Sequence, residues 1–340
     1  MRAFRIIGPL KGEVVEQKVY EIKANEVLVR VGACGICGTD IHIFKGELPL
    51  KYPVVPGHEI SGEVIEVGSE VQFFRKGDKV AVNPNLYCRK CYYCKRGLVH
   101  FCENWKAIGI HLPGGFAEYV KVPEFLLHKV PETLSFEEAA FAEPIACCLH
   151  GIRRLEISTG DKVAVFGLGP IGLIHIQLAK MSGASLVVGI DLIEKKLKIA
   201  ESLGADYTIN AGSKDPVKEI MSLTEGRGVD KVIEATGSPK VLEQALRVID
   251  YCGKILVFGV APPEAKVNIS PYIVYRKEVT IMGSFTNPFT TEDSVKLLSS
   301  GVVKVKPLVS HVIRLEDIVE YFNRIMRRDK DIIKVLVKPG

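Results

Sequence analysis

Hydrophobic and polar positions alternate along the chain in two different ways. Residues 1 to about 130 hold short runs of β-branched residues interrupted by glycine, as in EVLVRVGACGICG, ISGEVIEVGSEV and GGFAEYVKV. Such runs, with a turn about every eight to twelve residues, are typical of an all-β, partly open barrel. The pattern therefore predicts a β-rich N-terminal domain.

From Asp161 the pattern changes to alternating strands and helices. KVAVFGLG, SLVVGIDL, VDKVIEATG, KILVFGV and EVTIMGS have the composition of apolar strands, and amphipathic segments such as PIGLIHIQLAKMSG separate them. This alternation predicts a doubly wound parallel sheet with helices on both faces. The fold class expected for the whole chain is α/β, with a β-rich domain and a parallel-sheet domain.

A helix is expected between these two regions, in SFEEAAFAEPIACCLHGIRRL. Ser135 suits its N-cap, and Glu138 follows three residues later, which is the capping-box arrangement. Pro144 is expected to kink the helix, because proline lacks the N–H group that a helix interior uses. We expect this helix to connect the two domains.

Composition and charge narrow the classes of function. The chain of 340 residues is 47% hydrophobic and 25% charged, with 45 Lys and Arg against 40 Asp and Glu. The basic residues are interspersed with acids, which argues against a nucleic-acid partner. The N-terminal stretch does not read as a signal peptide, and no run reaches the roughly 18 apolar residues of a membrane span, so we expect a soluble cytoplasmic protein.

The segment GLGPIG directly follows the apolar strand KVAVF and opens an apolar helix. Gly167, Gly169 and Gly172 suit a tight turn, a close approach to a pyrophosphate and close helix packing. Asp191 follows Gly172 by 19 residues, at the end of the next strand, where a carboxylate can accept ribose hydroxyls and repel a 2′-phosphate. The motif predicts a dinucleotide site that prefers NAD to NADP; the alternative is a glycine turn without a ligand.

Four of the nine cysteines form the pattern C-x2-C-x2-C-x7-C: Cys88, Cys91, Cys94 and Cys102. Four thiolates at this spacing can close a tetrahedral zinc site, and nearby cations such as Arg89 partly offset its negative charge. No ligand position would stay open, so this zinc would be structural. An iron–sulfur cluster and unrelated free thiols are the alternatives.

A second candidate metal set combines Cys37 in CGICGTDIH with His58 and Glu59 in PGHE. A thiolate, an imidazole and a carboxylate leave one zinc position for water or a substrate oxygen, which is what a catalytic zinc requires. The residues alone leave two alternatives open. GHE can be a satisfied turn, and Cys34 can replace Cys37 as the ligand.

Together these motifs resemble the zinc-dependent medium-chain alcohol dehydrogenase family. CGICGTD, PGHEISGEV, the four-cysteine lobe, GGFAEYV, AEP, GLGPIG and VIEATG occur in the order of the family, over nearly the whole chain. The resemblance implies a GroES-like catalytic domain, a Rossmann domain and an active site in the cleft between them. The implied boundaries are 1–150 for the catalytic domain with its zinc lobe at 88–102, 151–287 for the Rossmann NAD-binding domain, and 288–340 for a return to the catalytic domain.

The resemblance also implies roles for single residues. The Cys37, His58 and Glu59 set is implied to hold the catalytic zinc, and Glu143 of AEP either to bind it or to hold its water. Thr39 is implied to accept the alcohol proton and His42 to pass it to solvent, although a histidine there can also be a surface residue without a role. Cofactor contacts are implied at Gly167, Gly169, Pro170, Ile171, Gly172, Asp191, Thr236, Gly259, Val260, Ser284 and Phe285.

These inferences predict an enzyme that uses zinc and NAD to oxidise a secondary alcohol of a polyol or sugar-derived substrate, as a homotetramer or homodimer. Glutamate at position 143 resembles both the polyol and the threonine dehydrogenase branches, so L-threonine 3-dehydrogenase is the alternative activity. A hypothesis of another class is a zinc-stabilised nucleotide-binding protein that has lost catalysis. Its support would be the loss of Cys37, Thr39, His58 or Glu59, and all four are present.

Overall fold

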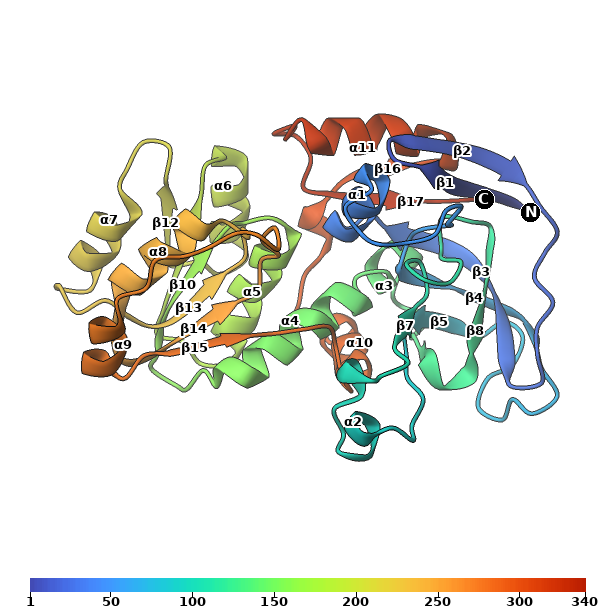
Figure 1. Cartoon of the computed structure of the whole chain (residues 1–340), viewed down its shortest axis with the longest axis horizontal. Coiled ribbons are helices and arrows are strands. Elements are labelled where there is room, and N and C mark those ends of the chain that lie inside the picture. Colours follow the sequence, from blue (N-terminus) through green and yellow to red (C-terminus); the bar gives the residue numbers. More distant parts are fainter. The chain divides into compact units, whose positions relative to one another are not determined.

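The computed structural model describes residues 1–340, and the chain divides into two compact units. The first unit comprises residues 1–146, 288–301 and 309–340, and the second comprises residues 147–287 and 302–308. Each unit has its own sheet (Figure 1). Each also has its own hydrophobic core. The expected α/β class, with a β-rich part and a parallel-sheet part, is confirmed.

The first unit is built on a mixed seven-stranded sheet. Its strand order is β16-β17-β3-β4-β5-β9, and β8 pairs with β3. Only β16 and β17 run parallel. The strands are β3 (Glu26–Gly35), β4 (Glu59–Val67), β5 (Lys79–Val82), β8 (Tyr119–Pro123), β9 (Leu127–Lys129), β16 (Val309–Ile313) and β17 (Lys334–Val337), with separate pairs β1 (Arg2–Gly8) and β2 (Lys11–Glu16), and β6 (Asn85–Leu86) and β7 (Lys106–Ala107).

The core of the first unit joins segments from both ends of the chain. The ring of Phe322 lies 6.0 Å from Phe4 and 5.1 Å from Phe44, between ring centroids, and all three side chains are fully buried. Phe322 lies on α11 (Ile318–Met326), and Phe44 lies on α1 (Gly38–Lys45). Burying such rings removes a large apolar area from water, so this cluster fixes the C-terminal segment to the N-terminal strands.

The second unit contains a parallel six-stranded sheet with strand order β12-β11-β10-β13-β14-β15. The strands are β10 (Lys162–Phe166), β11 (Leu186–Asp191), β12 (Tyr207–Asn210), β13 (Val229–Glu234), β14 (Ile249–Val257) and β15 (Thr280–Gly283). The chain proceeds outward from β10 to β12 on one side and from β13 to β15 on the other. The strand order therefore reverses between β10 and β13, which is where open α/β sheets bind ligands.

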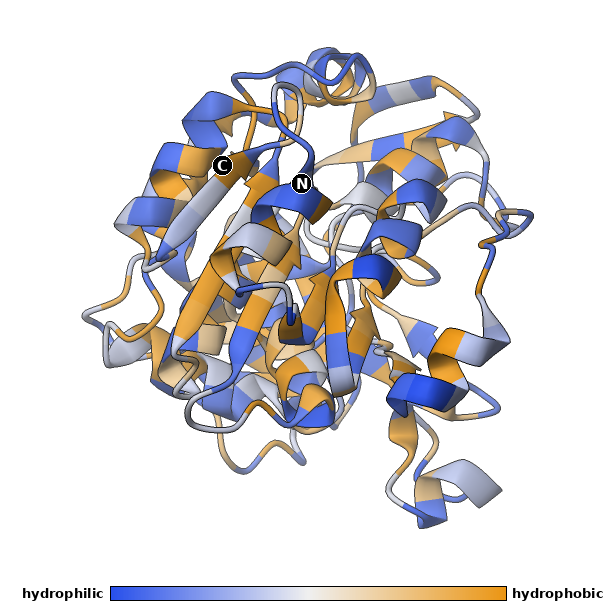
Figure 2. Ribbon diagram, turned by 90° about the vertical axis from the view of Figure 1, so that its left-hand side faces the viewer, coloured by the Kyte–Doolittle hydropathy of each residue, from blue (hydrophilic) through white to orange (hydrophobic).

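Helices and strands of the second unit differ in how hydrophobic and hydrophilic residues are distributed along them. Figure 2 shows strands that are mostly hydrophobic, whereas the helices carry hydrophilic and hydrophobic residues along different sides. This is the pattern of a sheet buried on both faces by amphipathic helices. The helices are α5 (Pro170–Met181), α6 (Glu194–Ser202), α7 (Pro216–Leu223), α8 (Pro239–Val248) and α9 (Pro271–Lys277).

The helix expected from Ser135 is in fact two helices. Ser135 Oγ accepts from the Glu138 backbone N–H, so the predicted capping box is confirmed, but α3 (Phe136–Ala139) ends after one turn. A second helix, α4 (Ala142–Leu155), follows. Pro144 lies in the first turn of α4, where its missing N–H breaks no helical bond. The prediction of a kink at Pro144 was therefore wrong, and the interruption comes before it.

The remaining helices of the first unit are short, namely α2 (Tyr92–Lys95) in the cysteine lobe and α10 (Thr291–Ser299). No helix of the structure combines the length and the apolar character that crossing a bilayer requires.

Candidate active site

The three residues of the second metal set meet because β3 and β4 are neighbours. Gly35 at the end of β3 pairs with Glu59 at the start of β4, and Cys37 follows two residues later, directly before α1. His58 precedes Glu59 and is buried with it. One ligand atom from each of Cys37, His58 and Glu59 lies within 4.8 Å of the others. The structure thus assembles a thiol, an imidazole and a carboxylate at one point.

Asp40, which the sequence analysis did not single out, holds this set in place. Its carboxylate is fully buried and accepts from the backbone N–H of Cys37 at 2.8 Å and of Gly57 at 3.1 Å. Its Oδ1 lies 3.7 Å from His58 Nδ1. Burial raises the pKa of Asp40, and the His58 charge and the Cys37 N–H act against that rise. Asp40 therefore fixes the backbone at Cys37 and at Gly57, the residue before His58, as outer-shell carboxylates of metal sites orient the ligands.

The donor set fits a zinc ion. The Nδ1 atom of His58 is buried and makes no hydrogen bond, whereas most buried polar atoms in proteins have a partner. Burial lowers the pKa of His58, but the neighbouring Cys37 and Asp40 charges raise it well above its ordinary value. Negative charge is therefore concentrated here, and sulfur, nitrogen and oxygen donors together match the borderline softness of Zn²⁺.

Cys34 and Glu143 lie near this set but outside it. Cys34 is fully buried, and burial raises its pKa well above the ordinary value. Its sulfur is not part of the group of converging ligand atoms, whereas that of Cys37 is, so the structure favours Cys37 over Cys34. Glu143, at the start of α4, is buried and acts electrostatically on His58. It does not belong to the three-residue group whose ligand atoms converge.

A second residue that the sequence analysis missed is Lys334 at the start of β17. Its side chain is 4% exposed, and its Nζ forms an ion pair with Glu59 Oε2. The same nitrogen donates to the carbonyl of Ile36 at 2.9 Å. The C-terminal strand therefore places a buried cation against one of the three candidate ligands.

Thr39 and His42 lie on α1, directly after Cys37. Thr39 Oγ1 is 3.7 Å from Cys37 Sγ, so its hydroxyl reaches the metal set. His42 is one helical turn further on, and its ring is 39% exposed. His42 Nδ1 lies 2.5 Å from Glu47 Oε2, a partner that the sequence motif did not indicate. The helix thus carries hydroxyl and imidazole groups from the buried set towards solvent.

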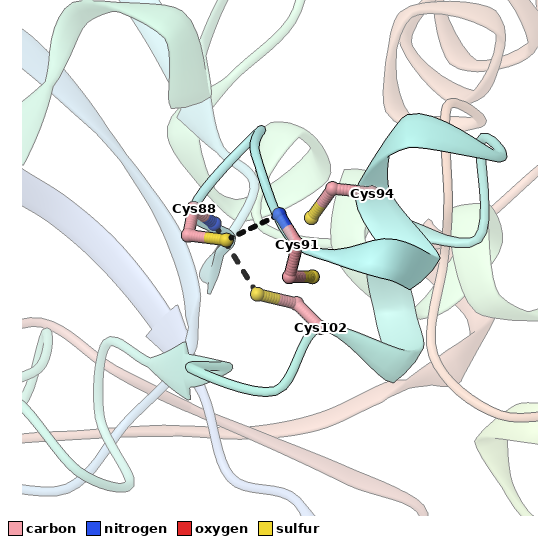
Figure 3. Close-up of side chains that lie close together, drawn as sticks. All are labelled: Cys88, Cys91, Cys94 and Cys102. Atoms are coloured by element: carbon pink, nitrogen blue, oxygen red, sulfur yellow. Dashed lines mark hydrogen bonds between the residues drawn. The ribbon is translucent and has the colours of Figure 1, made fainter.

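The four-cysteine lobe brings its sulfurs together as predicted. The ligand atoms of Cys88, Cys91, Cys94 and Cys102 lie within 4.8 Å of one another (Figure 3). Backbone N–H groups also point at sulfur: Cys91 N donates to Cys88 Sγ and Cys88 N to Cys102 Sγ, each at 3.3 Å. Such N–H donors stabilise thiolates, which are the form that binds metal.

The ionisation of these thiols shows why the lobe suits a dication. The backbone N–H of Lys90 helps to lower the pKa of Cys88 to about 6. In contrast, burial and the neighbouring thiols raise the pKa of Cys94 to about 12. Four thiolates so close together repel one another unless a cation lies between them. A zinc ion would let all four sulfurs ionise.

The glycine loop after β10 is shaped to receive a phosphate. Gly167 has a φ of +90°, and a Cβ at Gly172 would strike the Gly167 carbonyl, so neither position admits a side chain. Gly169 flanks α5, and nothing lies within 4 Å of where its Cβ would be. Pro170 takes the first position of α5 and Ile171 the second. The first N–H groups of a helix have no partner within it, and the space beside Gly169 is open.

Asp191 closes this loop from the next strand. Its Oδ2 accepts from Leu168 N at 2.7 Å, and its Oδ1 accepts from Leu192 N at 2.7 Å and Ile193 N at 3.0 Å. Backbone N–H donors keep such a carboxylate fixed in the loop. Oδ1 thus accepts two hydrogen bonds and Oδ2 only one, so Oδ2 keeps a lone pair that a ribose hydroxyl could use.

The loops after β13 and β14 are joined on the other side of the switch point. Glu234, which the sequence analysis did not single out, accepts from Thr236 N at 2.7 Å and Gly237 N at 3.1 Å. Gly259 lies so close to Gly237 that a side chain there would collide with its backbone. The other expected cofactor residues follow in the same unit: Val260 and Phe285 are exposed, and Ser284 has a buried hydroxyl without a hydrogen-bond partner.

Comparison with known proteins gives matches along both units. Residues 23–132 match the family model of the alcohol dehydrogenase GroES-like domain, and residues 170–300 match that of the zinc-binding dehydrogenases. D-arabinitol dehydrogenase 1 of Uromyces fabae is 34% identical over all of this chain and 97% of its own length.

Two further matches cover nearly the whole chain. L-threonine 3-dehydrogenase of Pyrococcus horikoshii is 36% identical over 94% of this chain and 92% of its own length. A crystal structure from Sinorhizobium meliloti, of a protein described as a zinc-binding dehydrogenase and bound to NADP, is 36% identical and has a TM-score of 0.94 over 99% of both chains. Polyol and amino-acid dehydrogenases are thus similar to this chain to nearly the same degree.

Proposed function

The chain belongs to the zinc-dependent medium-chain alcohol dehydrogenase family, and from this membership we propose that it oxidises a secondary alcohol of a polyol or sugar-derived substrate with NAD. The observation that carries the proposal is the convergence of Cys37, His58 and Glu59 within 4.8 Å. Three mixed ligands leave a fourth tetrahedral position for an alcohol oxygen. When bound, zinc supplies a Lewis acid that acidifies the alcohol, and NAD supplies the hydride acceptor.

The remaining steps belong to side chains of α1. Thr39 accepts the proton of the alcohol hydroxyl while it releases its own hydroxyl proton, and its position 3.7 Å from Cys37 Sγ supports this role. His42 takes the proton on to solvent, which its partial exposure allows. Glu47 accepts a hydrogen bond from the His42 ring and orients it. Glu143 adds a carboxylate beside His58 and either ligates zinc or holds its water.

The second unit holds the dinucleotide. The N–H groups around Gly169 bind the pyrophosphate, and Asp191 accepts the hydroxyls of the adenosine ribose. The loops at Thr236, Gly259 and Ser284 border the nicotinamide. The carboxylate of Asp191 supports NAD over NADP, because a 2′-phosphate would meet its negative charge; the relative from Sinorhizobium meliloti binds NADP.

The four cysteines of the lobe hold a second, structural zinc. Four sulfur donors leave no position for substrate, so this ion acts on the stability of the lobe and not on the reaction. The division is one catalytic and one structural zinc per chain.

We also propose a homo-oligomer in a reducing compartment, the cytoplasm. The six-stranded sheet ends at β15, whose outer edge has no partner strand, and Tyr251, Tyr272 and Tyr275 are exposed in the same unit. An open edge with exposed aromatic residues is a surface that a second copy can cover. None of the nine cysteines forms a disulfide, which supports a reducing compartment.

A substrate panel tests the proposed activity. Wild-type protein is supplied with NAD and, in separate reactions, with polyols, L-threonine and simple alcohols, and the initial rate of NADH formation gives kcat/KM for each. We expect the highest value for a polyol. The highest value for L-threonine would support the alternative activity. No NADH from any alcohol, despite bound zinc and bound NAD, would support the non-catalytic alternative.

A further inference from the structure

A buried ion pair joins the C-terminal strand to the candidate zinc site. Lys334 Nζ contacts Glu59 Oε2, and the two side chains are 4% and 2% exposed. Lys334 is held from a second direction, because its Nζ donates to the carbonyl of Ile36 at 2.9 Å. Strand β17 adds next to β3 through the pairs Leu336 with Gly35 and Val337 with Cys34. Backbone pairing and side-chain contact thus fix the lysine at this point.

The space for the pair is provided by Gly35. A Cβ at Gly35 would lie 2.8 Å from Lys334 Cε and would also collide with Glu59 Oε2. The two side chains therefore occupy the volume above a residue that has no side chain of its own. The contact is a packed part of the site and not a surface ion pair.

The surroundings of Lys334 suit an ammonium group. Its Nζ meets the Glu59 carboxylate and the Ile36 carbonyl, and both are acceptors. In the absence of metal, Glu59 would otherwise be a buried carboxylate without a counter-ion, which is costly. A zinc ion at the same carboxylate would bring two positive charges close to the ammonium group, and like charges repel.

We propose that Lys334 is a positioning residue that serves as the counter-ion of Glu59 before zinc binds and, by competing for that carboxylate, makes zinc binding at the Cys37, His58 and Glu59 site weaker and reversible. This inference rests on the proposed zinc function of the site. The pair keeps Glu59 aimed at the site in the metal-free chain. The positive charge of Lys334 also offsets part of the negative charge of the Glu59 carboxylate, so this carboxylate attracts a metal ion less strongly.

Thermodynamic linkage gives this role a signature that simple packing lacks. Any residue that stabilises the metal-free form more than the zinc form weakens zinc binding by the difference between the two stabilisation free energies. Loss of Lys334 should therefore destabilise the metal-free chain more than the zinc-loaded chain and should tighten zinc binding. Loss of a residue that only fills space would destabilise both forms equally and would leave zinc affinity unchanged.

The test compares Lys334→Met with Lys334→Arg in the full-length protein. Zinc affinity is measured by competition with a chelator, and melting temperatures are measured with and without zinc. The zinc titration should show two binding steps, one for each site. The step that is missing in Cys37→Ser belongs to the Cys37, His58 and Glu59 site. We expect Lys334→Met to lower the melting temperature mainly in the metal-free form and to tighten zinc binding on the order of tenfold. Lys334→Arg should restore both values.

Lys231 supplies the matched control, since it is buried at 8% exposure and its Nζ lies 3.6 Å from Asp161 in the second unit. Lys231→Met should lower both melting temperatures equally. The proposal is overturned if Lys334→Met does the same, or if its zinc affinity is unchanged or weaker. If wild-type protein binds no zinc at the Cys37 site, the proposed function fails as well, so the two failures are distinguishable.

Discussion

The carboxylate of Asp191 accepts a hydrogen bond from the backbone N–H of Leu168 at 2.7 Å. The acidic residue at the end of β11 is therefore also part of the glycine loop that follows β10. In the sequence, Asp191 is only a residue at the right distance from a glycine motif. In the structure its side chain also holds the glycine loop, so its substitution should have two consequences that can be separated.

Asp191→Asn and Asp191→Ala should differ in their effects on cofactor binding. Asparagine keeps one oxygen acceptor for the loop but loses the charge that repels a 2′-phosphate, so the affinity for NADPH should rise relative to NADH. Alanine removes the loop acceptors as well, so NADH binding should weaken by ~1 to 3 kcal/mol. Dissociation constants from fluorescence titration check both. A wild-type protein that already prefers NADPH would contradict the role given to this carboxylate.

Cys88→Ser should remove the structural zinc without removing the catalytic one. Serine is a poor zinc ligand, and a structural site can contribute on the order of 10 kcal/mol of binding coupled to local folding. The zinc content measured by metal analysis should fall from about two ions per chain to about one. Cys252→Ser, at an exposed cysteine outside both sets, is the control and should retain both ions. Iron in the wild-type protein would instead indicate a cluster in the lobe.

His42→Ala should reduce turnover only in part. The variant keeps the zinc ligands but loses the proton exit, so kcat should fall ~10- to 1000-fold, and the loss should shrink as pH rises and hydroxide takes the proton. Added imidazole should restore some activity. Glu47→Gln keeps an acceptor for the His42 ring but removes the negative charge that lies 2.5 Å from it, so it should cause a smaller loss. A pH-independent loss with no imidazole rescue would leave His42 without a role in proton transfer.

His175 should make the folded state sensitive to acid. It is fully buried on α5, its ring nitrogens have no hydrogen-bond partner, and burial lowers its pKa to about 3. In the unfolded chain His175 has a pKa near 6.5, so as the pH falls it binds a proton there before it does in the folded state. The free energy of unfolding is therefore unaffected by His175 above about pH 6.5 and decreases as the pH drops towards 3. Between pH 7 and pH 5 this histidine should account for about 2 kcal/mol of lost unfolding free energy.

The measurement for His175 is the free energy of unfolding in urea as a function of pH. His175→Leu keeps an apolar side chain against Phe258, whose ring centroid is 4.7 Å from that of the histidine. Its stability should therefore change less between pH 7 and pH 5 than that of the wild type. Equal slopes for the two proteins would show that His175 does not remain neutral in the folded state.

The parts of the site that sequence predicts are those in which neighbours in space are neighbours in the chain. The glycine loop lies within six residues and the cysteine lobe within fifteen, so spacing alone indicates their chemistry. Cys37 and Glu59 are further apart, but they meet through the pairing of two consecutive strands, β3 and β4. Local patterns therefore sufficed for the fold class and for finding most of the side chains that converge at the two candidate metal sites.

The residues that sequence analysis missed depend on long-range packing or on competition between polar groups. Lys334 reaches Glu59 only because the last strand returns to β3, and nothing near Lys334 in the sequence marks it. Asp40 lies inside the motif CGTD, but only the structure shows its hydrogen bond to Cys37 N and its burial. The break between α3 and α4 falls at Ala140 and Phe141, where no glycine or proline marks it in the sequence.

The most direct test of the catalytic zinc site is the rate of NAD reduction as zinc is returned to chelator-treated protein, with the best alcohol of the panel as substrate. In the wild type, the rate should rise with occupancy of the Cys37, His58 and Glu59 site and should not rise with occupancy of the lobe. Cys37→Ser should keep the lobe zinc and show no turnover at any pH, because a neutral hydroxyl is a poor replacement for a thiolate ligand. Full turnover by Cys37→Ser, with one zinc per chain, would contradict the account.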